Sequence, residues 1–303
     1  MQLETSLREF ERLAGLALES GRNMAEFTSM GVGGAAAGYL APLDLSQSGR
    51  ALSAARKLGL PVLVAGLGTN LIVLEGGIKG LVLHLAPHLD KVSLDDRTVI
   101  AEAGYTLPRL CKLVAKAGLT GLEFCSGIPG TLGGAVAQNA GWKEHQIGEL
   151  VQRVWIFDEQ GGLMPVSGEE AGFGYRTSRF KREGLVVARV ELRLAVGDPA
   201  VIQRQICEYA HTRISTQPTG KSAGSVFKNP PGDAAGRLLE LAGAKGMRVG
   251  GARLSERHAN FIVNEGDATG ADIVKLMAKA AELVLERFGI LLEPEVEVLG
   301  ALA

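Results

Sequence analysis

The residue types best suited to ligand chemistry lie in one glycine-rich run, which reads GLEFCSGIPGTLGGAVAQNAG from Gly121 to Gly141. The run is too apolar for a solvated loop and too interrupted for a helix. Glycine is needed where the backbone takes a positive φ, or where another group approaches bare peptide N–H. A buried segment rich in unpaired N–H donors suits a polyanion such as a pyrophosphate. A tight buried crossover without a ligand is the alternative interpretation.

Two shorter glycine motifs do not satisfy the requirements of a Rossmann site. Gly31–Ala36 matches GxGxxA, and Gly66–Gly68 begins a second GxG. A Rossmann fingerprint must leave a strand and open a helix. The first motif follows no convincing strand, and the second runs into the predicted strand Leu71–Leu74. Gly220–Ser222 is similar to the end of a P-loop, but Ser215 occupies the required first glycine, so this interpretation fails as well.

The histidine and cysteine patterns predict neither a metal site nor disulfides. His84 and His88 are four residues apart, but Pro87 lies between them and no third ligand is near. The three cysteines are odd in number, widely spaced and without a CxxC pair, which is typical of buried thiols in a reducing compartment. They are Cys111, Cys125 and Cys207.

Length and charge exclude several classes of protein. The chain has 303 residues, enough for two or three domains. It carries 32 Lys+Arg and 33 Asp+Glu, and the resulting net charge of -1 argues against nucleic-acid and anionic-membrane partners. Charged residues interrupt any signal-peptide core near the N-terminus, and there is no apolar run of about 18 residues. We therefore expect a cytoplasmic protein, with no obligate protein partner implied.

Hydrophobic periodicity predicts a mixture of helices and strands that would position these motifs. A domain boundary is predicted at Gly197-Asp198-Pro199, where Asp198 can cap a helix with Pro199 at its first position. Residues 185–194 alternate between apolar and charged residues, which indicates an antiparallel or edge strand. The other predicted helices cover residues 5–20, 51–58, 107–117 and, between Thr269 and Gly289, the tail; the other predicted strands cover 62–65, 71–74, 81–85 and 98–103.

The order of the motifs resembles one enzyme family. Three glycine turns, at Thr28–Gly34, Ala65–Asn70 and Gly121–Gly141, are similar to the flavin-binding loops of UDP-N-acetylenolpyruvoylglucosamine reductases, which act in peptidoglycan precursor synthesis. The elements GYRTS from Gly174, GSVFKNP from Gly224 and LEPEV from Leu292 resemble further family signatures. The resemblance extends from about Phe27 to Gly300 and is closer to the shorter family subtype.

This resemblance implies an α+β fold. A vanillyl-alcohol-oxidase-type (PCMH-type) FAD-binding domain would occupy residues 1–197, and a C-terminal α/β substrate-binding domain residues 198–303, with its last strand, 291–300, returning to the active-site cleft. FAD would bind non-covalently and NADPH would be the electron donor. A basic residue is common in the family where Gly31 stands. The implied FAD-binding residues are Thr28, Gly33, Gly34, Gly66, Gly68, Thr69, Asn70, Ser126, Gly127, Ile128, Pro129, Gly130, Thr131, Gly133, Gly134, Asn139, Ala140 and Gly141.

The resemblance also assigns three catalytic residues. Arg176 would bind the substrate carboxylate and stabilise an enolate, a task suited to its planar fork of donors. Glu295 would share that stabilisation, and Ser225 would donate the final proton. An ion pair at a domain interface for Arg176 and a loop cap for Ser225 are the structural alternatives. Glu293 lies two residues from Glu295 and is interpreted as a surface charge.

The implied substrate is a nucleotide sugar. Its binding residues would be Tyr175, Gln217, Lys228, Asn229, His258 and Asn260. Some relatives carry lysine where Thr216 stands. The resemblance predicts NADPH-dependent reduction of UDP-N-acetylglucosamine-enolpyruvate to UDP-N-acetylmuramate. Two alternatives are an FAD oxidase or dehydrogenase acting on an alcohol or hydroxy acid, and a non-enzymatic regulator that binds flavin or nucleotide sugar.

Overall fold

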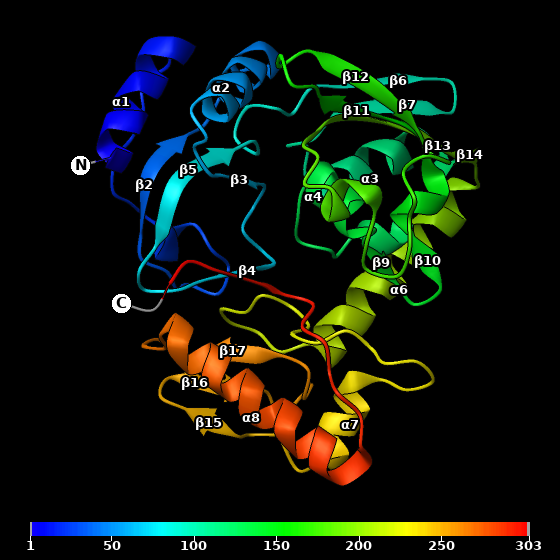
Figure 1. Cartoon of the computed structure of the whole chain (residues 1–303). Helices are drawn as coiled ribbons and strands as arrows, with labels where there is room; N and C mark the ends of the chain where they lie inside the picture. Colours follow the sequence, from blue (N-terminus) through cyan, green and yellow to red (C-terminus); the bar gives the residue numbers. More distant parts are fainter. Residues whose placement is uncertain (1, 302–303) are drawn as a thin grey trace. The chain divides into compact units, whose positions relative to one another are not determined.

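The computed structural model describes residues 2–301 and forms two compact units, each built from separate parts of the chain (Figure 1). The first unit comprises the residues up to Ser20, Gly38–Leu67 and Gly80–Arg213; the second comprises Gly21–Ala37, Gly68–Lys79 and the residues from Ile214 onward. The predicted boundary after residue 197 describes contiguous domains, and it stays a prediction.

The first unit contains most of the helices and the largest sheet. Its helices are α1 (Gln2–Ala14), α2 (Leu45–Lys57), α3 (Leu107–Lys116), α4 (Leu132–Gln138), α5 (Arg179–Arg182) and most of α6 (Pro199–Thr216). Its strands are β3 (Val62–Ala65), β6 (Val92–Asp95), β7 (Thr98–Glu102), β8 (Leu119–Thr120), β9 (Gly141–Trp142), β10 (His145–Gln146), β11 (Val151–Phe157), β12 (Leu163–Ser167), β13 (Val187–Arg193) and β14 (Ala195–Val196). Two 3-10 turns, Glu123–Cys125 and Ile147–Leu150, complete it.

A five-stranded antiparallel sheet, in the order β12-β11-β13-β7-β6, is the centre of this unit. Helices α3 and α4 lie over one face of it (Figure 1). Val190 and Leu192 of β13 are fully buried, whereas Arg193 is exposed, so the predicted alternation is confirmed. Because β13 has partners on both sides, it is an interior strand and not an edge.

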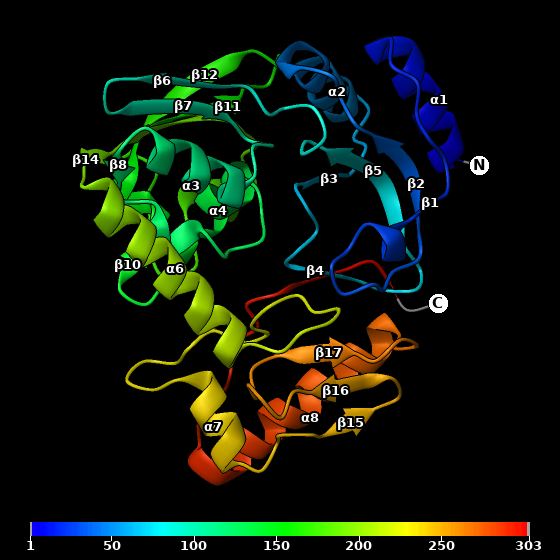
Figure 2. The same ribbon diagram turned by 180° about the vertical axis from the view of Figure 1, so that it is seen from behind.

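The second unit is smaller and contains a short antiparallel sheet. It contains β1 (Arg22–Asn23), the 3-10 turn Met24–Glu26, β4 (Leu71–Val73), α7 (Ala235–Leu241), β15 (Arg248–Val249), β16 (Ala252–Leu254), β17 (Ile262–Asn264), α8 (Gly270–Phe288) and β18 (Glu297–Leu299). Helix α8 packs against the β15-β16-β17 sheet, which faces the viewer in Figure 2. Its apolar face, including Ile273 and Leu276, joins Ile262 in a separate core.

Two strands have residues in both units. They are β2 (Ala35–Leu40) and β5 (Ile78–His84), which belong to a four-stranded sheet of order β1-β2-β5-β3. Strand β3 pairs with β5 in parallel, whereas β4 pairs in parallel with β18 near the C-terminus. The strand predicted for 291–300 is therefore shorter than expected, because Pro294 has no N–H to donate and only residues 297–299 form a ladder.

Local capping explains where several helices begin and end. Thr269 and Asp272 form the predicted capping box of α8, and Gly289 ends the helix with a φ of 68°. Asp44 caps α2, which therefore begins six residues before the predicted Ala51. The helix predicted for residues 5–20 ends at Ala14, because Gly15 takes a φ of 63°.

Within residues 2–301, no helix combines the length and apolar character needed to cross a membrane.

A close backbone contact in the first unit should make a glycine-to-alanine replacement inside helix α2 destabilising. Gly49 lies inside α2, where replacing glycine by alanine normally stabilises a helix by about 1 kcal/mol. A Cβ at Gly49 would overlap the carbonyl oxygen of Gly161. We therefore expect Gly49→Ala to destabilise the protein by about 1–3 kcal/mol in urea unfolding. Ser46→Ala, at an exposed position of the same helix, is the control; a stabilising Gly49→Ala would contradict this contact.

Candidate active site

The predicted site residues are divided between the two units. The first unit holds Gly66, Ser126, Gly127, Ile128, Pro129, Gly130, Thr131, Gly133, Gly134, Asn139, Ala140, Gly141, Tyr175 and Arg176. The second unit holds Thr28, Gly33, Gly34, Gly68, Thr69, Asn70, Gln217, Ser225, Lys228, Asn229, His258, Asn260 and Glu295. Convergence of Arg176 with Ser225 and Glu295 therefore stays a prediction, and each unit is described separately.

In the second unit, the segments that carry Ser225 and Glu295 are adjacent. The Glu295 N–H donates to the Val226 carbonyl at 2.9 Å, and the Lys228 N–H donates to the Glu293 carbonyl at 2.9 Å. Phe227 and Pro294 form an isolated antiparallel bridge between these hydrogen bonds. The predicted proton donor and the predicted catalytic carboxylate are thus held on neighbouring segments by the backbone.

Asn260 stabilises the segment that contains Ser225. Its side-chain oxygen accepts from the Phe227 N–H at 2.9 Å, and its side-chain nitrogen donates to the Phe227 carbonyl at 2.8 Å. Its own carbonyl accepts from the Val226 N–H at 2.9 Å. Asn260 is 3% exposed, so these bonds lie in the core of the unit. The structure gives this predicted substrate-binding residue a structural role beside Ser225.

Asn70 gives the Glu295 segment a similar support. Its side-chain nitrogen donates to the Glu295 carbonyl at 3.2 Å, and its own carbonyl accepts from the Glu297 N–H at 2.9 Å. The neighbouring Gly68 carbonyl accepts from the Ser29 N–H at 3.2 Å, which joins the first two glycine turns. The second glycine turn therefore positions the C-terminal segment.

An ion pair lies close to Ser225 along the chain. Lys228 forms an ion pair with Glu293 at 3.1 Å, and the Glu293 side chain is 71% exposed. Among residues 2–301, the Ser225 hydroxyl donates to and accepts from no other group. Lys228 therefore stands three positions after Ser225 in the sequence, and its exposed carboxylate partner, Glu293, can be displaced into solvent.

In the first unit, Arg176 lies in a strained tight turn. Gly174 and Thr177 exchange two backbone hydrogen bonds, at 3.0 and 3.2 Å, across Tyr175 and Arg176. Arg176 has a φ of 55°, a left-handed conformation that non-glycine residues rarely adopt and that is concentrated at functional sites. Its Nη1 donates to the Gly141 carbonyl at 3.0 Å. The guanidinium lies 5.5 Å from the ring centre of Tyr175, which is 49% exposed.

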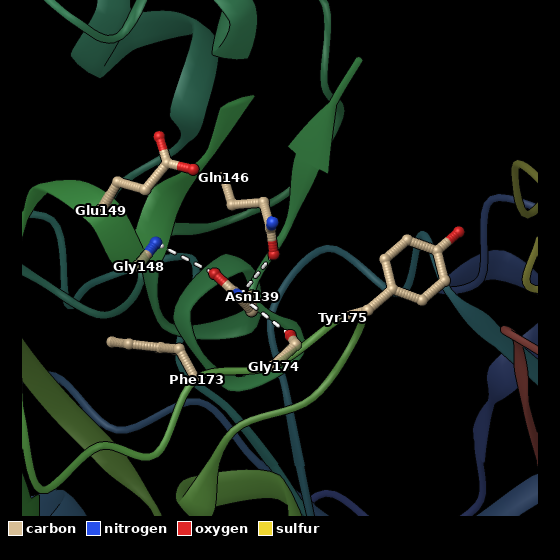
Figure 3. A pocket seen from close by; sticks show the side chains of 7 residues that line it. All are labelled: Asn139, Gln146, Gly148, Glu149, Phe173, Gly174 and Tyr175. Carbon is tan, nitrogen blue, oxygen red and sulfur yellow. Dashed lines mark hydrogen bonds between the residues drawn. The ribbon is translucent and has the colours of Figure 1, made fainter. Parts of the chain in front are cut away.

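A cavity of about 310 Å³ borders this turn. Tyr175 lies at one side and Glu149 at the other in Figure 3. The remaining lining residues are Asn139, Gln146, Gly148, Phe173 and Gly174. The predicted anion-binding run and the predicted catalytic turn thus share one cavity of the first unit.

Comparison with known proteins shows the family to which the chain belongs. Residues 36–166 match an FAD binding domain, and residues 216–299 match the C-terminal domain of UDP-N-acetylenolpyruvoylglucosamine reductase. The reductase of Heliobacterium modesticaldum is 43% identical over 91% of this chain and 89% of its own length. The chain belongs to the UDP-N-acetylenolpyruvoylglucosamine reductase family.

Further relatives agree with this membership in the reductase family. The reductase of Moorella thermoacetica is 44% identical over 91% of both chains. A crystal structure of the reductase from Thermus caldophilus is 37% identical, covers 93% of this chain and 98% of its own, and has a TM-score of 0.80. The predicted fold class is confirmed: a PCMH-type FAD-binding domain is joined to a C-terminal domain of the reductase family.

The glycine-rich run of this family member retains donors for a dinucleotide phosphate. The Ser126 hydroxyl is buried and has no hydrogen-bond partner among the described residues. The half-buried N–H groups of Gly66, Gly127 and Gly130 likewise donate to no acceptor within residues 2–301. A Cβ at Gly66 would overlap the Thr131 hydroxyl, so the second and third turns are in contact. These groups fit an FAD pyrophosphate.

Other donors of the same run are already used inside the protein. The N–H groups of Leu132 and Gly133 donate to the carbonyls of Tyr105 and Ala103, at 2.8 and 2.9 Å. The Gly134 N–H donates to the Thr131 hydroxyl at 3.4 Å. The glycines of the first turn also have a packing role, because a Cβ at Gly34 would overlap the Glu75 carbonyl. Contacts of Gly33, Gly34, Gly133 and Gly134 with FAD stay predictions.

Arg213 is a functional candidate that the sequence motifs did not indicate. Its guanidinium donates to the Gly127 carbonyl and lies 4.7 Å from the ring centre of Trp142. Burial lowers the pKa of Arg213 to about 10, so it remains charged at neutral pH. A Cβ at Gly127 would lie 2.5 Å from the Arg213 Cδ. Arg213 therefore fixes the glycine-rich run and places a positive charge beside it.

Lys221 is a second residue whose position the sequence motifs did not indicate. A Cβ at Gly31, which has a φ of 71°, would lie 2.6 Å from the Lys221 Cδ and 3.2 Å from its Nζ. The Lys221 side chain thus occupies the space of the absent side chain at residue 31. The contact between Gly31 and Lys221 could not be predicted from the sequence, because the two residues are 190 positions apart.

His258 is held neutral by its surroundings. Its Nδ1 accepts from the Asn260 N–H at 3.3 Å, and its ring packs edge-to-face on Phe261 at 4.8 Å. Burial lowers the pKa of His258 below the usual histidine value of 6.5. A lowered histidine pKa contributes stability that is fully present above 6.5 and is lost as the pH falls through the lowered value.

We therefore expect the melting temperature to fall as the pH decreases from 7.5 to 5, and to fall less in His258→Gln. Differential scanning fluorimetry across this range measures the difference. His211→Gln, on the exposed surface of α6, is the matched control and should follow the wild type. Identical pH profiles for His258→Gln and the wild type would exclude His258 as the titrating group.

Proposed function

We propose that this protein reduces the enolpyruvyl ether of UDP-N-acetylglucosamine-enolpyruvate to UDP-N-acetylmuramate, with non-covalent FAD and with NADPH as electron donor. Family membership over 91% of the chain supports the reaction class. The observation that carries the assignment is the backbone pairing that holds Ser225 and Glu295 on neighbouring segments. The predicted cytoplasmic location belongs to the same proposal.

Each protein group has a defined task in this reaction. The three glycine turns would hold FAD, which after reduction by NADPH would supply a hydride to the methylene carbon of the enolpyruvyl group. The Arg176 guanidinium binds the adjacent carboxylate through its planar fork and stabilises the enolate charge. The Glu295 carboxyl group shares this stabilisation. The Ser225 hydroxyl donates the proton to the enolate carbon, which completes the saturated ether, and the serine oxygen regains a proton from solvent.

Substrate recognition uses the second unit. The Lys228 ammonium is suited to a pyrophosphate oxygen, and an anionic substrate would compete with Glu293 for it. The Asn229 side-chain oxygen accepts from the Ala235 N–H at 3.0 Å, which orders the segment after Lys228. Arg257 donates to the carbonyls of Ile214 and Gln217, at 3.0 and 3.1 Å, and anchors the loop that leads to Ser225. Contacts of Gln217, Asn229, His258, Asn260 and Tyr175 with the nucleotide sugar belong to this proposal.

The assay of the purified protein tests the reaction itself. We expect a yellow protein that oxidises NADPH only when the enolpyruvyl substrate is added. NADPH oxidation that depends on oxygen and whose rate does not change when this substrate is added would instead indicate an oxidase. Binding of flavin without turnover would indicate a regulator.

Single-turnover kinetics of Ser225→Ala test the proton donor. Flavin reduction by NADPH should remain fast, and reoxidation by substrate should slow by about 100-fold or more, because general acid catalysis contributes about 10²–10⁴-fold. Ser222→Ala is the control in the same loop, where the Ser222 hydroxyl accepts from the Gly224 N–H. If Ser225→Ala keeps both half-reactions at the wild-type speed, another group donates the proton.

The Lys228–Glu293 ion pair generates a second prediction. Glu293→Gln removes the competing carboxylate, so the substrate KM should fall severalfold while kcat changes little, since an exposed ion pair contributes at most about 1 kcal/mol. Steady-state kinetics at low salt measure the change. Glu286→Gln, on the exposed side of α8, is the control for lost negative charge. A raised KM in Glu293→Gln would show that Glu293 supports substrate binding.

A further inference from the structure

The Asn139 side chain joins three segments of the first unit (Figure 3). Its nitrogen donates to the Gln146 side-chain oxygen at 2.7 Å and to the Gly174 carbonyl at 2.9 Å. Its oxygen accepts from the Gly148 N–H at 3.0 Å. Asn139 is 3% exposed, and both of its N–H bonds and its oxygen are used within the protein. The Asn139 side chain therefore binds other segments of the protein.

The local conformation explains why this residue is asparagine. Asn139 ends α4 in the left-handed conformation, with a φ of 46° and a ψ of 55°. Glycine and asparagine are favoured there, but glycine has no side-chain amide. Aspartate has the same shape, but its carboxylate cannot donate to the Gly174 carbonyl. Gly148 must also lack a side chain, because a Cβ there would lie 2.7 Å from the Asn139 oxygen.

The hydrogen bond to Gly174 controls the turn that presents Arg176. Gly174 is the first residue of the Gly174–Thr177 turn, and Arg176 is its third. Arg176 is strained at a φ of 55°, and its Nη1 returns to the Gly141 carbonyl, two residues beyond Asn139. The end of the glycine-rich run therefore holds the turn at two points. Without the Asn139 amide, the part-buried Gly174 carbonyl would lose one of its two donors and keep the Thr177 N–H, so the strained turn could relax.

We infer that Asn139 is a positioning residue for Arg176, a role that rests on the proposed function. Asn139 fixes the Gly174–Thr177 turn so that the guanidinium is aimed before substrate arrives. Pre-oriented groups matter because a displacement of about 1 Å can cost about 100-fold in rate. The effect should appear in the half-reaction that needs Arg176 and should leave flavin reduction near the wild-type rate.

The Asn139→Asp variant tests this role with the least change in shape. It keeps the acceptor for the Gly148 N–H, removes the donors to Gln146 and Gly174, and places a carboxylate oxygen against the Gly174 carbonyl. In stopped-flow experiments with the FAD-loaded enzyme, we expect reoxidation by substrate to slow by about 100-fold and reduction by NADPH to stay near normal. Unchanged reoxidation in a folded, FAD-loaded variant would overturn the inference.

A double-mutant cycle separates positioning from general stability. If Asn139 acts through Arg176, then Asn139→Asp should have almost no further effect on reoxidation in an Arg176→Ala background, because the two changes remove one interaction. A full additional slowing in that background would show that Asn139 acts elsewhere. Gln138→Ala is the matched control, since Gln138 neighbours Asn139 and its side-chain oxygen accepts from the Lys181 Nζ.

Hydrogen exchange distinguishes failure of this inference from failure of the proposed function. In Asn139→Asp, the amide hydrogen of Thr177 should exchange about tenfold faster, the change expected for loss of about one hydrogen bond that supports its turn. If exchange accelerates but Arg176→Ala reoxidises at the wild-type rate, the catalytic assignment of Arg176 is wrong and the turn support stands. If exchange is unchanged, Asn139 does not hold the turn.

Discussion

Backbone segments of this protein approach one another more closely than a Cβ atom would allow, and the site geometry depends on this constraint. A side chain at Gly34 would overlap the Glu75 carbonyl, and one at Gly66 would overlap the Thr131 hydroxyl. The first requirement on these glycines is therefore packing of the chain against itself. The donors at Ser126, Gly127 and Gly130 have no acceptor within residues 2–301, and they fit a phosphate.

The three predicted catalytic residues are held in place in two different ways. In the second unit, Ser225 and Glu295 are placed by main-chain hydrogen bonds between neighbouring segments, with Asn260 and Asn70 as supports. In the first unit, Arg176 is placed by a strained turn that Asn139 and Gly141 hold. Asparagine appears in each support because its amide can donate and accept at once, which satisfies buried backbone groups with one side chain.

The sequence predicted several local features, but it missed helix α4 (Leu132–Gln138), which lies in the glycine-rich run that was expected to be too interrupted for a helix. The capping box at Thr269, the helix end at Gly289, and the alternation along β13 depend on neighbouring residues, and the structure has all three. The five-stranded sheet could not be predicted from such patterns, because its order depends on pairing between distant segments. The helix predicted for 5–20 was wrong at its end, since the apolar spacing continues past Gly15 although the backbone there turns left-handed.

The residue types and their order along the chain determined the family, the three glycine turns and the three catalytic candidates, because such motifs are read in sequence without knowing the fold. Only the tertiary structure revealed what Asn139, Arg213 and Lys221 do. Asn139 contacts Gly174, Arg213 contacts Gly127, and Lys221 fills the space beside Gly31. These contacts join positions 35, 86 and 190 residues apart, and no local pattern encodes a hydrogen bond or a steric contact over such distances.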